Sequence, residues 1–154
     1  MIFAIDPGTT QSGWVLYEPH RVIDSGVSDN YDMLEWVKAG QGASILALEM
    51  VASYGMAVGK EVFETVRWVG RFQQAWHQPE RVKLVYRAQV KLHLCKSAKA
   101  NDANIRQALL DLFPATGGGK TPQIGIKSKP GPLFGVSSHA WAALGVAVTV
   151  AGAA

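Results

Sequence analysis

Length, composition and charge exclude several classes of protein. The chain has 154 residues, 48% of them hydrophobic, which suits one domain spanning 1–154 with a buried core. A single cysteine, Cys95, excludes an internal disulfide and a cysteine-rich zinc site, and no basic-apolar signal segment opens the chain, so a cytoplasmic location is expected. The apolar stretch 140–154 is shorter than the roughly 20 residues of a membrane span, so no membrane segment is expected. A net charge of +3 fits an acidic partner such as nucleic acid without requiring one.

The first half of the chain predicts a sheet that begins with antiparallel strands. Apolar runs separated by turns predict strands over 1–5, 13–17 and 21–27. Helical spacing over 31–39, ended by Gly40, predicts a short helix, and 45–49 predicts a buried strand. The longest amphipathic helix is predicted over 57–76, and its apolar face consists of Val58, Val62, Val66, Val69 and Phe72.

The second half predicts one more strand, over 81–86, and helices over 88–94 and 102–113, the second capped by Asn101 or Asp102. The glycines, prolines and lysines of 115–134 predict a mobile or functional loop, and Ser137 or Ser138 is expected to cap a final helix. This order of elements predicts an α/β fold. Its mixed five-stranded sheet combines three antiparallel strands with parallel ones and is flanked by helices.

Two acids stand at the ends of predicted strands. Asp6 follows the first strand and precedes the turn 7–10, and Glu49 ends the strand over 45–49. Neighbouring strands lie about 4.7–4.9 Å apart, so acids at adjacent strand ends can share one hard metal ion. The alternative stays open at this point, because Asp before Pro-Gly is also a common turn former and a terminal Glu is often only solvated.

Four segments resemble the RuvC family of Holliday junction resolvases. They are Phe3-Ala4-Ile5-Asp6-Pro7-Gly8-Thr9-Thr10-Gln11-Ser12-Gly13-Trp14, Ala47-Leu48-Glu49-Met50-Val51, Tyr86-Arg87-Ala88-Gln89-Val90-Lys91 and Ser138-His139-Ala140-Trp141-Ala142-Ala143-Leu144-Gly145-Val146-Ala147. They occur in the family's order over nearly the whole chain, and the compact form with its Gly/Lys/Pro loop most resembles a bacteriophage member. The resemblance implies a ribonuclease H-like fold, a homodimer and, for a phage protein, a bacterial host cell.

The resemblance also implies a metal site. In the family two Mg²⁺ ions are held by four residues, which correspond here to Asp6, Glu49, His139 and position 142, and the nitrogen of His139 makes Mn²⁺ an alternative. The last position departs from the family pattern, because Ala142 supplies no oxygen. An engineered Asp-to-Ala substitution is the simplest explanation, and a naturally degenerate enzyme is the alternative.

The implied activity is cleavage of four-way (Holliday) and other branched DNA by two-metal phosphodiester hydrolysis, made slow or absent by Ala142. Basic residues near the acids are candidates for phosphate contacts, and Tyr54 is a candidate for stacking on an unpaired base. About half of the basic residues are expected to be ordinary solvated charges. The candidates for DNA contact are Tyr54, Lys60, Arg67, Arg71, Arg87, Lys91, Lys96 and Lys99. Trp68 or Trp76 is expected at a dimer interface.

The same residues leave three other functions open. A related nuclease that cuts RNA would share the fold and the metal chemistry. A non-catalytic junction-binding protein is favoured if Ala142 is natural. The run 6–10 also resembles the phosphate-binding hairpin of actin-like kinases, but those enzymes need two such domains and this chain has length for one.

Overall fold

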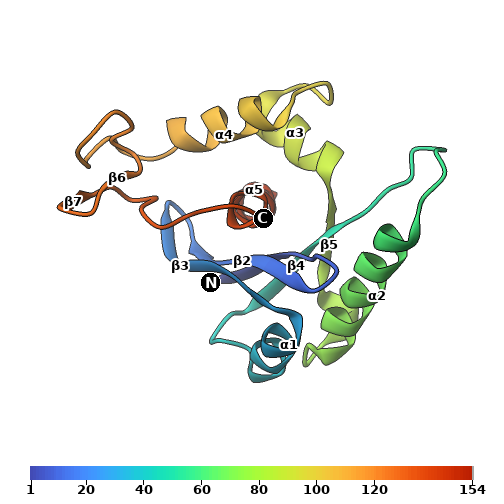
Figure 1. Cartoon of the computed structure of the whole chain (residues 1–154). Helices are drawn as coiled ribbons and strands as arrows, with labels where there is room; N and C mark the ends of the chain where they lie inside the picture. The colour runs from blue at the N-terminus through green and yellow to red at the C-terminus, as the bar shows by residue number, and fades with distance from the viewer. Residues whose placement is uncertain (154) are drawn as a thin grey trace.

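The computed structural model describes residues 1–153 and has one five-stranded sheet at its centre (Figure 1). The strands are β1 (Ile2–Asp6), β2 (Gln11–Glu18), β3 (Arg21–Asp29), β4 (Ile45–Met50) and β5 (Lys83–Tyr86), in the spatial order β3-β2-β1-β4-β5. The pairs β1–β2 and β2–β3 are antiparallel, whereas β1–β4 and β4–β5 are parallel. The predicted mixed sheet is therefore confirmed.

Helices cover both faces of this sheet. The helices α1 (Asn30–Ala39) and α2 (Lys60–Ala75) pack on one face, and α5 (Ala140–Gly152) packs on the other, beneath α3 (Arg87–Cys95) and α4 (Asp102–Asp111) (Figure 1). Side chains of a strand alternate between faces, so Phe3 and Ile5 enter the core beside α1 and α2, while Ala4 enters the core beside α5. Strand β1 is consequently buried on both sides, and its end has a fixed position.

The close approach of α5 to the sheet depends on Gly13 in β2. A Cβ atom at this position would lie 2.3 Å from the carbonyl carbon of His139 and 2.4 Å from its oxygen. Gly13 is also paired with Asp6 in the antiparallel register of β1 and β2. The missing side chain therefore lets the start of α5 lie against the end of β1.

Two helix starts differ from the sequence predictions. Helix α2 begins at Lys60, so Val58 lies in the preceding loop and not on the apolar face of the helix. Helix α5 begins at Ala140 with His139 in the N-cap position, and no side chain caps it, so the prediction of a cap at Ser137 or Ser138 is wrong. The backbone carbonyls of these two serines instead accept hydrogen bonds from Ala140 and Trp141.

The tryptophans expected at a dimer interface belong to the core of this chain. Trp68 is 6% exposed and Trp76 is 3% exposed, and both pack with Phe72 against the sheet. Burial within the chain removes them from any surface that a second copy could contact. Any interface on α2 has to use its exposed side, where Phe63 is 60% exposed.

The segment 115–134 is folded rather than featureless. It contains a two-stranded hairpin, β6 (Gly125–Ile126) and β7 (Lys129–Pro130), and Leu133 is fully buried in the core beside α5. A short 3-10 helix (Pro79–Arg81) precedes β5. Within residues 1–153, no helix is both long enough and apolar enough to cross a membrane.

Candidate functional site

The structure places Asp6 and Glu49 side by side. Ile5 of β1 is paired with Leu48 of β4 in parallel register, and the two acids are the next residues of these strands. Their carboxyl groups are hydrogen bonded to each other, and their side chains are only 15% and 14% exposed. Burial between two helical layers thus holds a pair of acids at one edge of the sheet.

Burial and mutual repulsion change the protonation of this pair. Burial raises the pKa of Glu49 to about 8, and the neighbouring carboxyl of Asp6 adds to the increase, while the charge of Arg87 opposes it. The pKa of Asp6 is also raised by burial, against the lowering effects of its hydrogen bond to Glu49 and the charge of Arg87. The pair therefore holds a proton near neutral pH, a state that a bound cation would displace.

Arg87 connects this pair to a third acid. As the first residue of α3, it directs one nitrogen to Oε1 of Glu49 at 3.5 Å and another to Oδ1 of Asp102 at the start of α4. Burial would lower the pKa of Arg87, but its hydrogen bonds and the charges of both acids raise it, so it stays cationic. A guanidinium ion is thereby fixed beside the acid pair.

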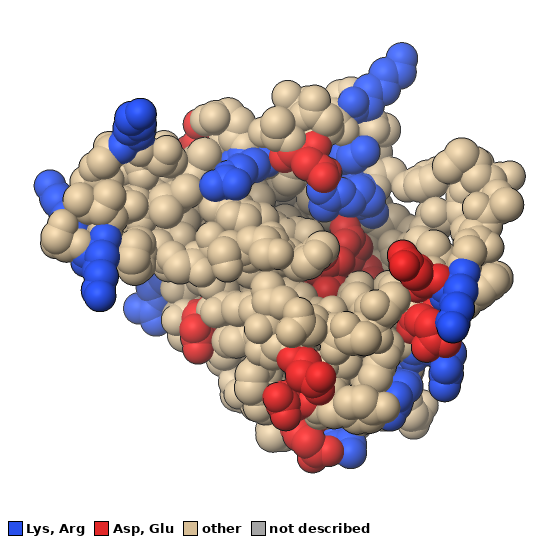
Figure 2. All heavy atoms as spheres, viewed as in Figure 1, with Lys and Arg blue, Asp and Glu red and all other residues tan. Residues whose placement is uncertain are grey.

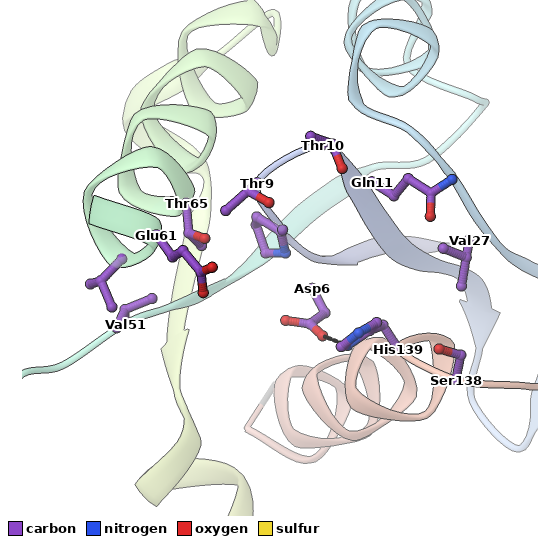
Figure 3. A pocket seen from close by; sticks show the side chains of 13 residues that line it. Asp6, Thr9, Thr10, Gln11, Val27, Val51, Glu61, Thr65, Ser138 and His139 are labelled. Carbon is purple, nitrogen blue, oxygen red and sulfur yellow. Dashed lines mark hydrogen bonds and ion pairs between the residues drawn. The ribbon is translucent and has the colours of Figure 1, made fainter. Parts of the chain in front are cut away.

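His139 contacts the other side of Asp6. Its Nδ1 atom lies 3.2 Å from Oδ2 of Asp6, and its side chain is 71% exposed (Figure 3). The two residues are 133 positions apart in the chain, and the close packing at Gly13 brings them together. His139 is thus positioned by the fold and free to meet a ligand from solvent.

A buried hydrogen-bond network holds the turn that follows Asp6. Ser12 Oγ donates to Asn30 Oδ1 at 2.5 Å, and Asn30 Nδ2 donates to the carbonyl oxygen of Gly8 at 2.9 Å. The backbone N–H of Gly8 donates in turn to Ser12 Oγ, and that of Asn30 donates to the carbonyl of Thr10. Ser12 and Asn30 are each 1% exposed, so this network fixes the turn without solvent.

A cleft of about 630 Å³ opens beside Asp6 and His139. Figure 3 shows Glu61 and Thr65 on the α2 side of it, with Thr9 beside Thr65 and with Ser138 and His139 across from them. The sequence did not mark Glu61 as a site residue, because its place at the cleft depends on how the first turn of α2 lies beside the end of β1. Figure 2 shows acidic side chains in a hollow at the middle of the molecule, with basic side chains around it.

Ala142 faces a different cavity. A groove of about 310 Å³ lies between α4 and the start of α5, and its lining includes His139, Ala142, Arg87, Asp102, Arg106 and Trp141. Position 142 shares this groove with two arginines and does not line either cavity that contains Asp6. Within residues 1–153, no three His, Cys, Asp or Glu side chains are grouped closely enough to hold a metal ion.

The candidate DNA-contact residues have different surroundings. Tyr54 is 68% exposed and lines a small cavity together with Asp6, Glu49 and Arg87. Two of the basic candidates use their polar groups within the chain: Arg67 pairs with Glu64, and Lys96 donates to the carbonyl oxygen of His93. Arg71 stacks on Trp68, which leaves its N–H groups available. Lys60 and Lys99 are exposed, and Lys91 is half-buried.

The chain has a fold known from solved structures. It is similar to a Thermus thermophilus RuvC structure, with a TM-score of 0.64 and 18% sequence identity, over 97% of this chain and 92% of that chain. It is similar over the same shares to T. thermophilus RuvC in complex with Holliday junction substrate, with a TM-score of 0.63 and 20% identity. This chain has a RuvC-like fold. No protein-family model matches the sequence, and no curated protein matches it. The predicted ribonuclease H-like architecture is confirmed by this similarity.

Proposed function

We propose that this chain is a nuclease-type protein that binds four-way and other branched DNA. Asp6, Glu49 and His139 form the site at which its active form would hydrolyse a phosphodiester bond. The observation that carries the proposal is the position of Asp6 between Glu49 and His139, at the end of the first strand of a RuvC-like sheet. The solved complex of a similar protein with Holliday junction substrate supports the choice of DNA.

The acids fit one divalent cation better than two. Asp6 and Glu49 are buried carboxyls that share a proton, and Mg²⁺ is usually held by one or two carboxylates while it keeps several waters. Ala142 offers no oxygen for a second ion, and Arg87 neutralises one side of Glu49. Mg²⁺ or Mn²⁺ bound there would stabilise the charge that develops on the reacting phosphate.

The chain's own groups have separate tasks. Asp6 ends β1, which is buried on both sides, and the buried network fixes the turn that follows it, so its carboxylate would keep a fixed position beside the reacting phosphate. His139 restrains Asp6 through Nδ1 and presents its exposed edge to the cleft, where it can orient water or a phosphate oxygen. Arg87 supplies a permanent positive charge next to Glu49. Tyr54 is exposed beside the acids, and we assign it to stacking on an unpaired base at the junction centre.

A dimer completes the proposal. A four-way junction is nearly two-fold symmetric, so two copies related by a two-fold axis can present two sites to opposing strands. The exposed side of α2, with Phe63, is the surface we assign to the contact, since Trp68 and Trp76 are buried. Light scattering at micromolar concentration is expected to give a dimer mass without DNA, and a monomer mass would contradict this part.

Single-turnover cleavage of a labelled four-way junction tests the function. The present chain is expected to bind the junction and to cut it very slowly, and Ala142→Asp is expected to increase Mg²⁺- or Mn²⁺-dependent cleavage. Adding Asp6→Asn to that variant should abolish cleavage while binding persists, because phosphate contacts lie elsewhere.

Two outcomes decide against this proposal. If Ala142→Asp and the present chain cut at equal rates, position 142 has no catalytic role. If a structured RNA is cut faster than the junction, the substrate is RNA. A non-catalytic junction-binding protein is the second candidate, favoured by Ala142 and by the pairing of Glu49 with Arg87, and it predicts tight binding with no cleavage by either form.

A further inference from the structure

The groove between α4 and α5 adjoins the acid site and shares residues with it. His139 lines both this groove and the cleft that contains Asp6, and Arg87 lines the groove while it contacts Glu49. A nucleic-acid strand whose reacting phosphate lies at Asp6 would therefore pass His139 to reach the groove. The side chains along that path decide which chemical group it can hold.

Arg106 of α4 is held in place on the wall of this groove. Its Cζ atom lies 4.6 Å from the centroid of the Trp141 ring, which is within the range of a cation–π interaction. A guanidinium stacked through its face keeps the N–H groups along its edge available. Stacking on Trp141 thus orients Arg106 without using its hydrogen-bond donors.

No carboxylate within residues 1–153 forms an ion pair with Arg106. Asp102, one helical turn earlier in α4, pairs with Arg87 instead, and Asp111 accepts a hydrogen bond from Gln107. Arg67 of α2, by contrast, pairs with Glu64 three residues earlier in its helix. Arg106 is therefore an oriented cation whose positive charge is uncompensated.

The charges of the groove favour an anion with several acceptor oxygens. Two arginines line it against the single carboxylate of Asp102, which is already paired with Arg87. The small side chain of Ala142 leaves space in the groove that Arg87 and Arg106 line. A backbone phosphate of DNA has the charge and the acceptor oxygens that a guanidinium binds in a bidentate manner.

We infer that the groove between α4 and α5 is a phosphate-binding subsite in which Arg106, oriented by Trp141, binds a DNA backbone phosphate next to the one at Asp6. Arg106 is a binding residue here, and Trp141 is its positioning residue. The inference rests on the proposed function, because it assumes that the strand at Asp6 is nucleic acid. To the proposed function it adds Arg106 as a DNA-binding residue and a course for the DNA strand, which runs from the acids toward α4.

Equilibrium binding over a salt series tests the subsite, with Arg106→Gln compared to Arg81→Gln. Arg81 is an exposed arginine just before β5 and does not line the groove. Both variants therefore remove one positive charge, but only Arg106→Gln removes it from the groove. Arg106→Gln is expected to weaken junction binding about 5- to 10-fold near 0.1 M salt and to reduce the slope of log affinity against log salt by about 0.9. Arg81→Gln is expected to change the affinity less than about twofold with an unchanged slope.

A neutral methylphosphonate placed at single positions of the strand locates the contact. One position should weaken binding by the present chain but have no effect on Arg106→Gln, because the charge pair is already absent in that variant. Trp141→Leu should reduce affinity while the salt slope keeps most of its value, since the charge remains but is no longer oriented. Thermal unfolding of each variant checks that it is folded.

The outcomes separate this inference from the proposed function. If the chain binds the junction and Arg106→Gln behaves like Arg81→Gln, the subsite is wrong and the function stands. If linear single-stranded DNA is bound as tightly as the junction and binding still depends on Arg106, the subsite stands and junction selectivity fails. If neither DNA is bound, both are overturned.

Discussion

The two sides of the acid pair are built in different ways. Toward β2 and α1, Asp6 is followed by a turn that buried hydrogen bonds among Ser12, Asn30 and the Gly8 backbone fix, and it is paired with Gly13, where α5 packs tightly. Toward α3 and α4, Glu49 meets a chain of charges that runs through Arg87 to Asp102. Packing fixes the geometry on the first side, whereas electrostatics controls proton affinity on the second. Mutations on the two sides should therefore differ in kind.

The largest effect is expected from Gly13→Ala on the packed side. The new Cβ atom would overlap backbone atoms of His139 at 2.3 Å and 2.4 Å, and no side-chain rotation can relieve this. We expect a loss of about 3 kcal/mol in the free energy of unfolding, measured by urea denaturation. His139 would also move away from Asp6, so cleavage by the Ala142→Asp background should fall.

Gly70→Ala is the matched control for this change. Gly70 lies inside α2 with no atom within 4 Å of its added Cβ, so the same substitution should be neutral or stabilise by up to about 1 kcal/mol. Equal destabilisation by both variants would show that the approach of α5 to β2 does not depend on Gly13.

A smaller effect on the free energy of unfolding is expected on the charged side, from substitution of Glu49. Because its pKa rises from 4.5 to about 8 on folding, the unfolded state binds fewer protons than the folded state between these values. The contribution of Glu49 to the free energy of unfolding should therefore be largest below pH 4.5 and should fall as the pH rises toward 8. Glu49→Gln should remove this fall and stabilise the chain by about 2 kcal/mol at pH 8, measured by urea denaturation across pH.

Glu80→Gln serves as the control, because Glu80 is exposed and its substitution should leave the pH profile unchanged. Mg²⁺ should restore stability at pH 8 to the chain with Glu49 but not to Glu49→Gln, since the ion takes the place of the shared proton. Parallel pH profiles for the chain and Glu49→Gln would contradict the buried acid pair.

The smallest effect is expected far from the acids, in the hairpin lobe of residues 115–134. Replacing Lys120, Lys127 and Lys129 by Ala should lower junction affinity roughly threefold and reduce the salt slope by about 1, because exposed lysines on a lobe make few lasting phosphate contacts. Lys83→Ala, an exposed position in β5, is the control. A larger loss than that of Arg106→Gln would place the main DNA contact on the lobe instead of the α4–α5 groove.

Sequence patterns gave the elements correctly where the signal is local. Apolar runs bounded by turns predicted every strand of the main sheet. Gly40 was also correctly expected to end α1, where it adopts a left-handed φ of 82°. The helix starts at Lys60 and Ala140 were less predictable, because neither has a side-chain cap to mark it. The hairpin within 115–134 was missed because its strands have only two residues each, too few for a periodic pattern.

The sequence by itself determined that Asp6 and Glu49 stand near the ends of strands, since each acid directly follows an uncharged strand-forming run, whereas the pairing of these strands as neighbours was decided by the tertiary structure. Only the tertiary structure decided their partners: Arg87 and Asp102 beside Glu49, His139 on Asp6, and Trp141 beneath Arg106. The physical reason is that local periodicity sets which residues form a strand or helix, whereas contacts between distant elements depend on how the layers pack. The packing gap left by Gly13, for example, matters only once α5 lies against β2.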